Sequence, residues 1–422
     1  METSPPLSPA QATVGPGPLR RVVSLMDASA GHTQGILRGI RAFAHSRPDW
    51  ILRHALGNTQ PQMLLKWHPA GVIVYGPPPQ TLRILRSHRL SLVTVLHPIG
   101  ELPMVALDDY RVGGMVAQDL INRGFRELAM VGVFGQDWSN LRRDGFLPTA
   151  RAAGCRIHTY EIRLKPPLRP LSFNRIGLDP ALRRWLEKLP KPAAVFAAND
   201  LCAREIVQIC NSTGIRVPEQ LAVMGVDNDE FICQMTDPEL SSVDIPWQKI
   251  GYQAATVLDE IMRTGKPTSG QIFVPPSHVV TRQSTDSVAA GDPAVAAALR
   301  FIYHHAHEGI NVTHVLQSVL VARRRLERRF FKELGRTPLQ EIHRVRLERA
   351  KRLLAETDLS IDAIGLRCGI PQSRLSVVFH KATGLTPTQW RRRYRAVPDG
   401  PPFATEGGTD SGTTGGPPKR ET

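Results

Sequence analysis

Hydrophobic and polar positions follow two different patterns along the chain, and the change lies near residue 290. Up to about residue 286, short apolar runs alternate with amphipathic stretches. The run RVVSLMD (21–27) is typical of a buried strand, and GILRGIRAFAHSR (35–47) spaces Ile36, Ile40 and Phe43 along one helical face. GVIVYG, SLVTVLH, ELAMVGVFG, AAVFAAND and LAVMGVD repeat the strand signal, with helical stretches between them. This alternation predicts a doubly wound α/β fold with mostly parallel sheets.

The size of the α/β region predicts two lobes. Roughly 265 residues exceed one usual domain, so we expect two α/β lobes with a cleft between them. We expect this region to occupy residues 19–287. Residues 1–18 before it are rich in Pro, Gly and Ser, which is typical of disorder, and a similar tail occupies residues 398–422.

From Pro293 the strand signal stops and every stretch has a helical period. ARRRLERRFFKELG ends at Gly335, PLQEIHRVRLERAKRLLAET follows as a long helix, and SIDAIGLRCG begins at Ser360, a good helix cap. The long helix is predicted to carry one apolar stripe of Leu339, Ile342, Leu347, Ala350 and Leu354. Two units of a short helix, a tight turn and a longer helix predict an all-α domain with two helix-turn-helix units over residues 288–397.

Positive charge is concentrated in this helical region. The chain has a formal net charge of +15 and a pI near 10.1. Residues 291–396 contain 20 Lys and Arg against 9 Asp and Glu, so 11 of the 15 net charges lie there. Such an uneven balance is typical of a nucleic-acid-binding module attached to a near-neutral domain.

Several classes of protein are disfavoured by what the sequence lacks. We find no apolar stretch able to act as a signal peptide or to span a bilayer, so we expect a cytoplasmic protein without membrane contact. Cys368 together with His343 or His380 could hold a metal or act as a nucleophile, although a buried core cysteine is the commoner role. No GxSxG, P-loop or HExxH motif occurs, so we expect neither an enzyme nor a bound cofactor or metal.

The C-terminal region resembles the DNA-binding domain of AraC/XylS-family transcription regulators. The resemblance runs from LERRFFKELGRTP through RLERAKRLL to FHKATGLTPTQWRR. The matching residues are Leu326, Arg328, Phe330, Gly335, Pro338, Arg346, Leu347, Ala350, Leu353, Leu354, Ile361, Ile364, Gly369, Phe379, Gly384, Pro387, Trp390 and Arg391. The resemblance implies binding to a double-stranded DNA operator and, for an activator, contact with RNA polymerase.

Three departures from this family pattern concern the two recognition helices. Ala322 stands where a capping Ser is usual, at a cost of about 1 kcal/mol. Leu320 stands where Gly is common, and the second unit is one residue short between Gly369 and Phe379. We expect the second recognition helix to read different bases or to contact mainly the DNA backbone.

Candidate DNA contacts are side chains of the two recognition helices and the basic residues near them. Arginine can bind guanine bidentately and phosphate through its charge. The candidates are Arg323, Arg324, Arg325 and Arg328 in the first unit, and Gln372, Ser373, Arg374, Val377, Lys381, Arg391 and Arg392 in the second. Any one of these arginines could equally be a solvated surface charge, but that reading fits the whole patch poorly. Leu326 and Phe330 are expected to face the core.

The N-terminal region resembles the sugar-sensor domain of LacI/GalR regulators and periplasmic binding proteins. AVFAANDLCAREIVQ, LAVMGVDNDEF and VALDDYRVGGMVAQDL carry this resemblance. Joined to an AraC-type domain, it implies a sugar-responsive transcription activator that acts as a homodimer, with a pentose, xylose first, as its effector. A stand-alone sugar-binding protein is the alternative, but such a protein would need an export signal and no basic helical region.

Candidate sugar contacts lie at the ends of predicted strands, where ligands of doubly wound folds bind. They are Asp27, His32, Trp138, Arg142, Asn199, Asp200 and Asp227. The resemblance singles out Arg142 and Asp227, because sugar sensors of this kind carry a ligand-binding Arg and Asp at these places. Asp27, His32 and Trp138 could equally be loop caps or packing residues, and Asp108 and Asp109 fit structural positions at the crossover between lobes.

Overall fold

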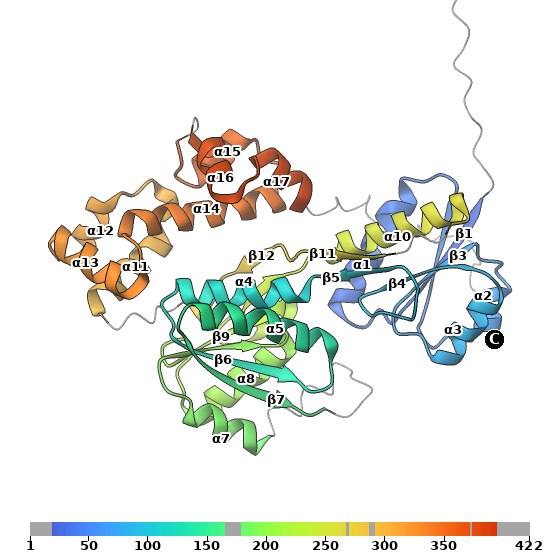
Figure 1. The fold of residues 1–422 in the computed structure, drawn as a ribbon, viewed down its shortest axis with the longest axis horizontal. Helices are drawn as coiled ribbons and strands as arrows, with labels where there is room; N and C mark the ends of the chain where they lie inside the picture. Colours follow the sequence, from blue (N-terminus) through green and yellow to red (C-terminus); the bar gives the residue numbers. More distant parts are fainter. Residues whose placement is uncertain (1–18, 165–178, 267–269, 287–291, 372–373, 395–422) are drawn as a thin grey trace, which may run out of the picture.

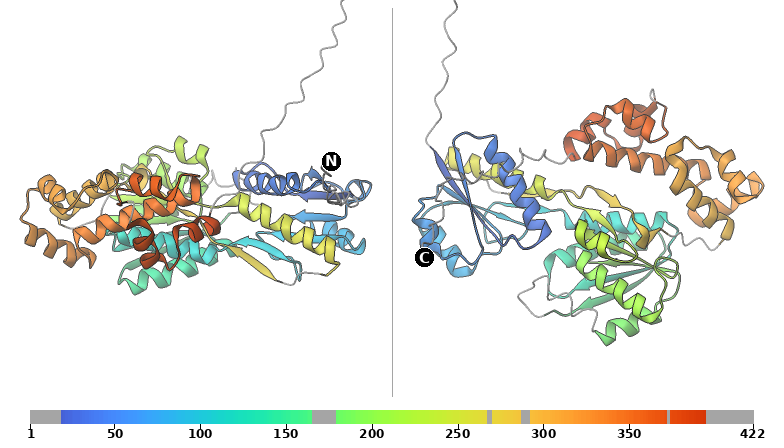
Figure 2. Two further views of the ribbon diagram at one scale, coloured as in Figure 1. Left: turned by 90° about the horizontal axis from the view of Figure 1, so that it is seen from above. Right: turned by 180° about the vertical axis from the view of Figure 1, so that it is seen from behind.

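The protein, a computed structural model, is described for residues 19–164, 179–266, 270–286, 292–371 and 374–394, without the side chains of residues 356 and 393. These residues form two α/β lobes and a helical domain (Figure 1). The two further views in Figure 2 place the helical domain beside the second lobe. The terminal segments 1–18 and 398–422 lie outside the described residues, so their expected disorder stays a prediction.

Lobe 1 is a parallel sheet with the strand order β11-β5-β4-β3-β1-β2. The strands are β1 (Arg20–Leu25), β2 (Trp50–Ala55), β3 (Gly71–Val74), β4 (Ser91–Val95), β5 (Met104–Leu107) and β11 (Gln271–Val274). Helices α1 (Gly31–His45) and α10 (Trp247–Thr264) pack on one face, and α2 (Pro61–Leu65) and α3 (Pro79–Ser87) on the other. Because both faces are covered, every residue of β3 is buried, which explains its continuous apolar run.

Lobe 2 has the strand order β12-β10-β9-β8-β6-β7, in which only the edge strand β12 is antiparallel to its neighbour. Its strands are β6 (Glu127–Val133), β7 (Arg156–Ile162), β8 (Ala193–Ala197), β9 (Leu221–Asp227), β10 (Ser241–Asp244) and β12 (His278–Val280). Its helices are α4 (Asp109–Asn122), α5 (Asp137–Ala152), α7 (Pro180–Lys188), α8 (Asp200–Thr213) and α9 (Glu230–Met235).

The chain crosses between the lobes three times. The crossings lie between β5 and α4, between β10 and α10, and between β11 and β12. Each lobe is therefore assembled from separate stretches of the sequence. This arrangement confirms the predicted two-lobed, mostly parallel α/β fold.

The helical domain contains two helix-turn-helix units, and each unit has its own apolar core. Its helices are α11 (Pro293–His305), α12 (Val312–Val319), α13 (Arg323–Leu334), α14 (Pro338–Glu356), α15 (Ile361–Arg367), α16 (Leu375–Thr383) and α17 (Pro387–Tyr394). Leu326 and Phe330 are fully buried, as predicted. The long helix α14 joins the units, because it contributes Ile342 to the first core and Leu354 to the second.

Other details of the helical domain agree with the sequence, and one differs. Ser360 caps α15, and its side chain accepts a hydrogen bond from the backbone N–H of Ala363 at 3.1 Å. Cys368 lies in the second core, and burial raises the pKa of its thiol to about 11, which favours the core role. Leu339 is 45% exposed, so its assignment to the apolar stripe was wrong: Pro338 takes the buried position at that end of α14. Within the described residues, no helix has the length and apolar character needed to cross a membrane.

The turn before α13 contains both departures noted in the first unit. Leu320 ends α12 in the left-handed region, with φ at +51°, and it is 91% exposed. Ala322 occupies the N-cap of α13 and provides no side-chain hydrogen bond to it. Leu320 therefore adopts a conformation that favours glycine, shortly before a helix that has no side-chain cap.

We expect Leu320→Gly to stabilise the helical domain by about 1 kcal/mol, because a β-carbon costs about 1–2 kcal/mol in the left-handed region. Ala322→Ser should add about 1 kcal/mol by capping the N–H of Arg324 or Arg325. Calorimetry of the full chain measures both effects, since 1 kcal/mol shifts the unfolding temperature of a domain of this size by about 4–8 °C.

The matched control is Leu366→Gly, which changes an 80% exposed leucine inside α15. At this helical position glycine should destabilise the domain by about 1 kcal/mol, because it has a low helix propensity and leucine adopts the helical φ without strain. Equal losses of stability at Leu320 and Leu366 would contradict the argument from the left-handed turn.

Candidate functional site

Polar and aromatic side chains of the two lobes meet where the lobes adjoin. We call this place the lobe junction. It is defined by His32, Tyr75, His97 and Trp247 of lobe 1 and by Asp109, Trp138, Arg142, Asp227 and Asp229 of lobe 2. The lobes approach closely here: a β-carbon on Gly31 would lie 2.6 Å from Oδ2 of Asp229. Charges on one lobe also act on groups of the other: burial is the main cause of the raised pKa of Tyr75 and of the lowered pKa of His32, and Asp227 and Arg142, respectively, add to these shifts.

Arg142 is the central group of the lobe 2 side. Its side chain is 5% exposed. Its Nε donates to Oδ1 of Asp109 at 2.8 Å, and its Nη1 donates to the backbone oxygen of Ala198 at 2.5 Å. Its Nη2 lies 3.9 Å from Oδ1 of Asp227, and the guanidinium lies 5.0 Å from the ring centre of Trp138. One buried cation thus links two acids, a strand end and an aromatic ring.

Close packing of α4 against α5 places Arg142 beside Asp109. A β-carbon on Gly145 would lie 1.8 Å from the backbone oxygen of Tyr110, and one on Gly113 would lie 1.9 Å from the backbone oxygen of Arg142. Only glycine permits two helix backbones to approach this closely. The first turn of α4 and the middle of α5 therefore meet, and their side chains bond to each other.

Unusual backbone geometry positions the ends of two strands. Asp227, at the end of β9, has φ at +112°, and Asn228 has φ at +49°. Leu96, which follows β4 and precedes His97, has φ at +65°. Such conformations cost about 1–3 kcal/mol each and are held by the surrounding structure, and they cluster at functional sites.

The lobe 1 side of the junction is aromatic and uncharged near neutral pH. The ring of His32 lies edge-on to Tyr75 with centres 5.8 Å apart, and its centre is 5.6 Å from that of Trp247. Tyr75 stacks on His97 at 5.5 Å. Burial lowers the pKa of His32 to about 4, with a further contribution from Arg142, and burial raises the pKa of Tyr75 to about 12.

The lobe 2 side carries charge. Burial raises the pKa of Asp227 to about 7, although Arg142 acts against this shift, and Asp109 and Asp229 add to it. Burial also raises the pKa of Asp109, against the effect of the bonded Arg142. An aromatic wall facing carboxylates and a guanidinium suits a polyhydroxylated ligand, because rings contact its C–H faces while the charged groups bond its hydroxyls.

Three of the predicted sugar contacts have other partners. Asp200 is buried, and its carboxylate accepts hydrogen bonds from Ser242 Oγ at 2.6 Å and from the backbone N–H of Asp229 at 2.9 Å. Asn199 caps α8 by accepting from the N–H of Cys202 at 2.9 Å. Asp27 is exposed and accepts from the N–H of Ser29 at 2.9 Å. The structure thus gathers His32, Trp138, Arg142 and Asp227 of the predicted set, and gives these three capping or internal contacts.

Sequence reasoning missed Tyr75, His97, Asp229 and Trp247. A signal for three of them was present, because Tyr75, His97 and Asp229 lie within two residues of the ends of β3, β4 and β9, where ligands of such folds bind. Trp247 has no comparable signal, since only the return of the chain to lobe 1 brings it to the junction. Asp109, expected to be structural, bonds to Arg142 within it.

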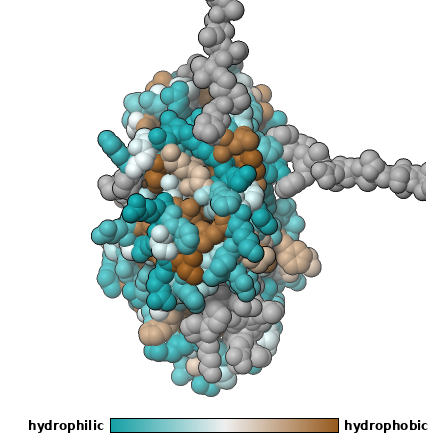
Figure 3. Space-filling model, turned by 90° about the vertical axis from the view of Figure 1, so that its right-hand side faces the viewer, coloured by the Kyte–Doolittle hydropathy of each residue, from teal (hydrophilic) through white to brown (hydrophobic). Residues whose placement is uncertain are grey.

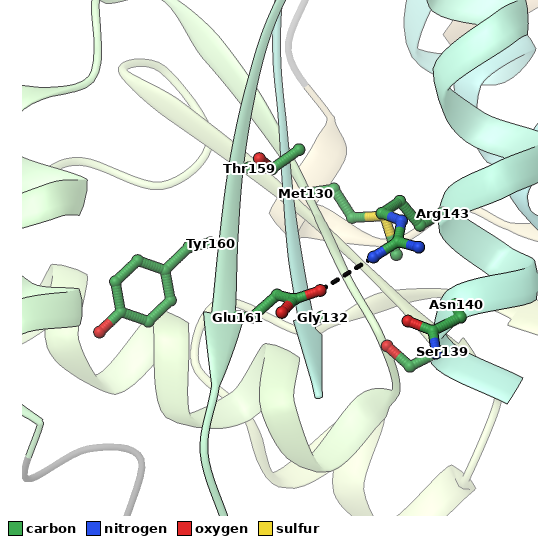
Figure 4. A pocket seen from close by; sticks show the side chains of 8 residues that line it. All are labelled: Met130, Gly132, Ser139, Asn140, Arg143, Thr159, Tyr160 and Glu161. Atoms are coloured by element: carbon green, nitrogen blue, oxygen red, sulfur yellow. Dashed lines mark hydrogen bonds and ion pairs between the residues drawn. The ribbon is translucent and has the colours of Figure 1, made fainter. Parts of the chain in front are cut away.

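Arg143, the residue after Arg142, points away from the lobe junction. It lines a small pocket between α5 and strands β6 and β7, shown in Figure 4. Its Nη1 donates to Oε1 of Glu161 at 2.9 Å, which the dashed line in Figure 4 marks. Ser139 in the same pocket accepts from the N–H of Val133 at 2.9 Å. These pocket groups thus satisfy one another, and the pocket adds no group to the lobe junction.

The first recognition helix, α13, exposes a row of cations. Arg323, Arg324, Arg325 and Arg328 are all exposed. Arg323 pairs with Glu327 at 2.9 Å, whereas the other three have no ion pair within the described part of the chain. Arg329 instead pairs with Asp292 at 2.9 Å and ties α13 to the start of α11. On α13, Arg329 thus has a structural contact, whereas Arg324, Arg325 and Arg328 are exposed and accessible to DNA.

The second recognition helix, α16, begins only at Leu375. Gln372 and Ser373 lie outside the described residues. Arg374, Val377, Lys381 and Arg392 are exposed. Arg391 is half-buried, and its Nη2 donates to the backbone oxygen of Leu359, so part of its bonding capacity is used inside the domain. The exposed surface of α16 is accordingly less basic than that of α13.

Both the α/β region and the helical domain match known protein families. Residues 117–285 match a periplasmic binding protein-like domain, and residues 316–393 match a helix-turn-helix domain. The xylose operon regulatory protein of Haemophilus influenzae is 32% identical over 333 residues, which cover 76% of this chain and 84% of that protein. The protein of the same name from Escherichia coli K12 is 31% identical over 384 residues, covering 88% and 96%.

Comparison with solved structures also finds regulators with the same fold. The structure of the xylose-binding transcription activator XylR matches 89% of this chain and 98% of its own, with 30% identity and a TM-score of 0.54. A complex of the transcriptional regulator CelR with cellobiose matches 64% of this chain and 86% of its own, with a TM-score of 0.52. At 22% identity the second match shows the fold alone.

Two α/β lobes in front of a double helix-turn-helix domain make this chain a sugar-controlled transcription regulator, and it belongs to the family of the xylose operon regulatory proteins.

Proposed function

We propose that this protein is a cytoplasmic transcription activator whose binding to operator DNA is controlled by xylose, or another pentose, held at the lobe junction. The observation that carries the proposal is the arrangement around Arg142: Asp109 and Asp227 flank its guanidinium, and the rings of His32 and Tyr75 lie close enough on the other lobe to interact with Arg142 and Asp227. Such an arrangement matches the needs of a small sugar, which has several hydroxyls and an apolar C–H face. The names of the relatives favour xylose.

The proposed regulator acts as a homodimer, contacts RNA polymerase and has no enzymatic activity of its own. An exposed apolar surface on lobe 1 offers a place for a second copy. The exposed large apolar side chains of β2, the loop after it and α2 include Ile51, Leu56 and Met63. Figure 3 views this end of the molecule, where apolar side chains gather among hydrophilic ones. A stand-alone sugar-binding role is not favoured, because it leaves the helix-turn-helix domain without a purpose.

Thermal unfolding in a panel of pentoses and hexoses tests the proposal. A sugar at 100 times its Kd should stabilise the protein by about 2.7 kcal/mol, and we expect xylose to give the largest shift. Asp227→Ala should weaken the binding of this sugar at least about tenfold, because a hydrogen bond to a charged group contributes about 1.5–3 kcal/mol. Operator binding without sugar should stay unchanged.

The matched control is Asp144→Ala, which removes a 53% exposed carboxylate from the same lobe, on the helix that carries Arg142. It should leave sugar binding intact. If only a hexose shifts the unfolding temperature, the effector is that hexose and not a pentose. If no sugar shifts the unfolding temperature, the proposed effector class is wrong.

Sugar affinity should depend on pH through Asp227. The pKa of its carboxyl is raised to about 7, so the group is largely protonated at pH 6 and largely ionised at pH 8. The ionised form accepts hydroxyl hydrogen bonds better, so xylose should bind about tenfold more weakly at pH 6 than at pH 8. Calorimetric titration measures this change. Asp227→Asn should bind weakly and equally at both pH values, and a wild-type Kd that does not change over this range would contradict the assignment.

Arg324→Ala, Arg325→Ala and Arg328→Ala should each weaken operator binding without altering sugar affinity. A lost phosphate contact lowers the slope of log K against log salt by about 1, whereas a lost base contact costs about 1–3 kcal/mol and relaxes base preference. Fluorescence anisotropy at several salt concentrations separates these cases. Arg183→Ala, which removes a half-exposed cation from α7 of lobe 2, is the control. Variants of α13 that bind like this control would exclude α13 as the DNA-contacting helix.

A further inference from the structure

The helical domain contacts lobe 2 at the C-terminal end of α4. The backbone oxygen of Asn122, the last residue of α4, accepts hydrogen bonds from Arg336 Nη2 at 2.6 Å and from the hydroxyl of Tyr303 at 3.4 Å. Close by, Arg126 Nη2 donates to the backbone oxygen of Glu333 at 3.0 Å. A helix C-terminus carries unpaired carbonyls and partial negative charge, so a cation such as Arg336 is a suitable partner.

Arg123 connects this contact to the interior of lobe 2. Its side chain is almost fully buried and donates to Asp119 at 2.6 Å, to Thr281 Oγ1 at 2.6 Å and to the backbone oxygen of Thr285 at 2.9 Å. Its guanidinium also lies 5.5 Å from the ring centre of Tyr303. Thr281 and Thr285 follow the third crossing between the lobes, so one side chain joins α4, the segment after that crossing and the helical domain.

On the side of the helical domain, Tyr303 is bonded to α14. Arg344 of α14 donates through Nη2 to the hydroxyl of Tyr303 at 3.0 Å, and its guanidinium lies 5.8 Å from the ring centre of Tyr303. Arg344 and Arg336 both pair with Glu341, which is fully buried. A displacement of Tyr303 would therefore reach α14, which contributes to the cores of both helix-turn-helix units.

The other end of α4 lies in the lobe junction. Asp109 begins this helix and bonds to Arg142 at 2.8 Å. At 1.5 Å per residue, α4 spans about 20 Å between Asp109 and Asn122. Figure 1 shows α4 running along lobe 2, below α14. The same helix thus touches the proposed sugar site with its first turn and the helical domain with its last.

A cleft leaves room for movement beside this contact. It has a volume of about 690 Å³ and separates lobe 2 from α14 and α17. Its walls include Pro275, Pro276 and Ser277 of the third crossing, and Arg349 and Arg352 of α14. Closure of the lobes would bend this crossing segment and alter the cleft, while the hydrogen bonds of Asn122 and Tyr303 hold the domains together at one end of it.

We propose that α4 transmits sugar binding to the DNA-binding domain through the α4–α14 contact, which we define by Asn122, Arg123, Tyr303, Arg336 and Arg344. The inference rests on the proposed function, because a sugar must favour one arrangement of the lobes to have anything to transmit. In it, Tyr303 and Arg336 are positioning residues: they touch neither the sugar nor DNA, and they determine how much one ligand alters the affinity for the other.

Two variants of the full-length protein test this role. Tyr303→Ala removes the ring and hydroxyl that join Arg123 to Arg344, and Arg336→Met removes the donor to Asn122 while Arg344 still neutralises Glu341. The quantity measured is the ratio of operator Kd without xylose to operator Kd with saturating xylose. We expect about 5–150-fold for the wild type, the usual range of allosteric coupling, and less than about twofold for each variant. The Kd for xylose in the absence of DNA should change less than about twofold.

Phe331→Ala is the matched control, since it removes a 62% exposed aromatic side chain from the same domain. It should keep the wild-type ratio. If either substitution unfolds the domain, Tyr303→Phe, which keeps the ring and removes only the hydroxyl, should still lower the ratio. Folded variants that respond to xylose like the wild type overturn the α4 inference alone. A wild type whose operator affinity no sugar changes overturns the proposed function and this inference together.

Discussion

The ion pair between Arg142 and Asp109 is the interaction on which the lobe junction depends. A guanidinium that is 5% exposed needs partners for its donors, because an unpaired buried charge costs several kcal/mol. Asp109, the oxygen of Ala198 and the nearby carboxylate of Asp227 supply them. The pair forms only because glycines at positions 113 and 145 bring the backbones of α4 and α5 into contact. Helix packing and the electrostatics of the site therefore have one cause.

The two sides of the junction offer different groups to the proposed ligand. Lobe 1 contributes rings whose titration lies outside the physiological range, since the pKa of His32 is about 4 and that of Tyr75 about 12. Lobe 2 contributes the groups whose charge responds to their surroundings, with the pKa of Asp227 at about 7. A ligand between the lobes would replace water around these carboxylates and contact the rings. That is the physical basis for linking occupancy of the junction to the arrangement of the lobes.

The basic character of the helical domain serves two purposes. Four arginines make structural contacts. Arg329 pairs with Asp292, Arg344 pairs with Glu341, and Arg336 donates to Asn122 of lobe 2. Arg346 donates to the backbone oxygens of Ala306, in η3 (Ala306–Glu308), and of Ile310 in the turn after it. Arg324, Arg325 and Arg328 stay exposed on α13. Net charge alone could indicate a nucleic-acid-binding module, but it could not distinguish these groups. The weaker charge of α16 suggests unequal contributions of the two units to DNA affinity.

The sequence by itself determined the two-lobed α/β region, the double helix-turn-helix domain and the pairing of Leu326 with Phe330 in its core, because these follow from periodicities of neighbouring residues. It also indicated Arg142 and Asp227 through family resemblance. Only the tertiary structure decided that Asp200 bonds to Ser242 and Asp229 inside lobe 2, that Tyr75, His97 and Trp247 join the junction, and that Asn122 meets Arg336. These contacts join residues well apart in the chain, some of them across a lobe crossing or a domain boundary, and local patterns carry no information about such distances.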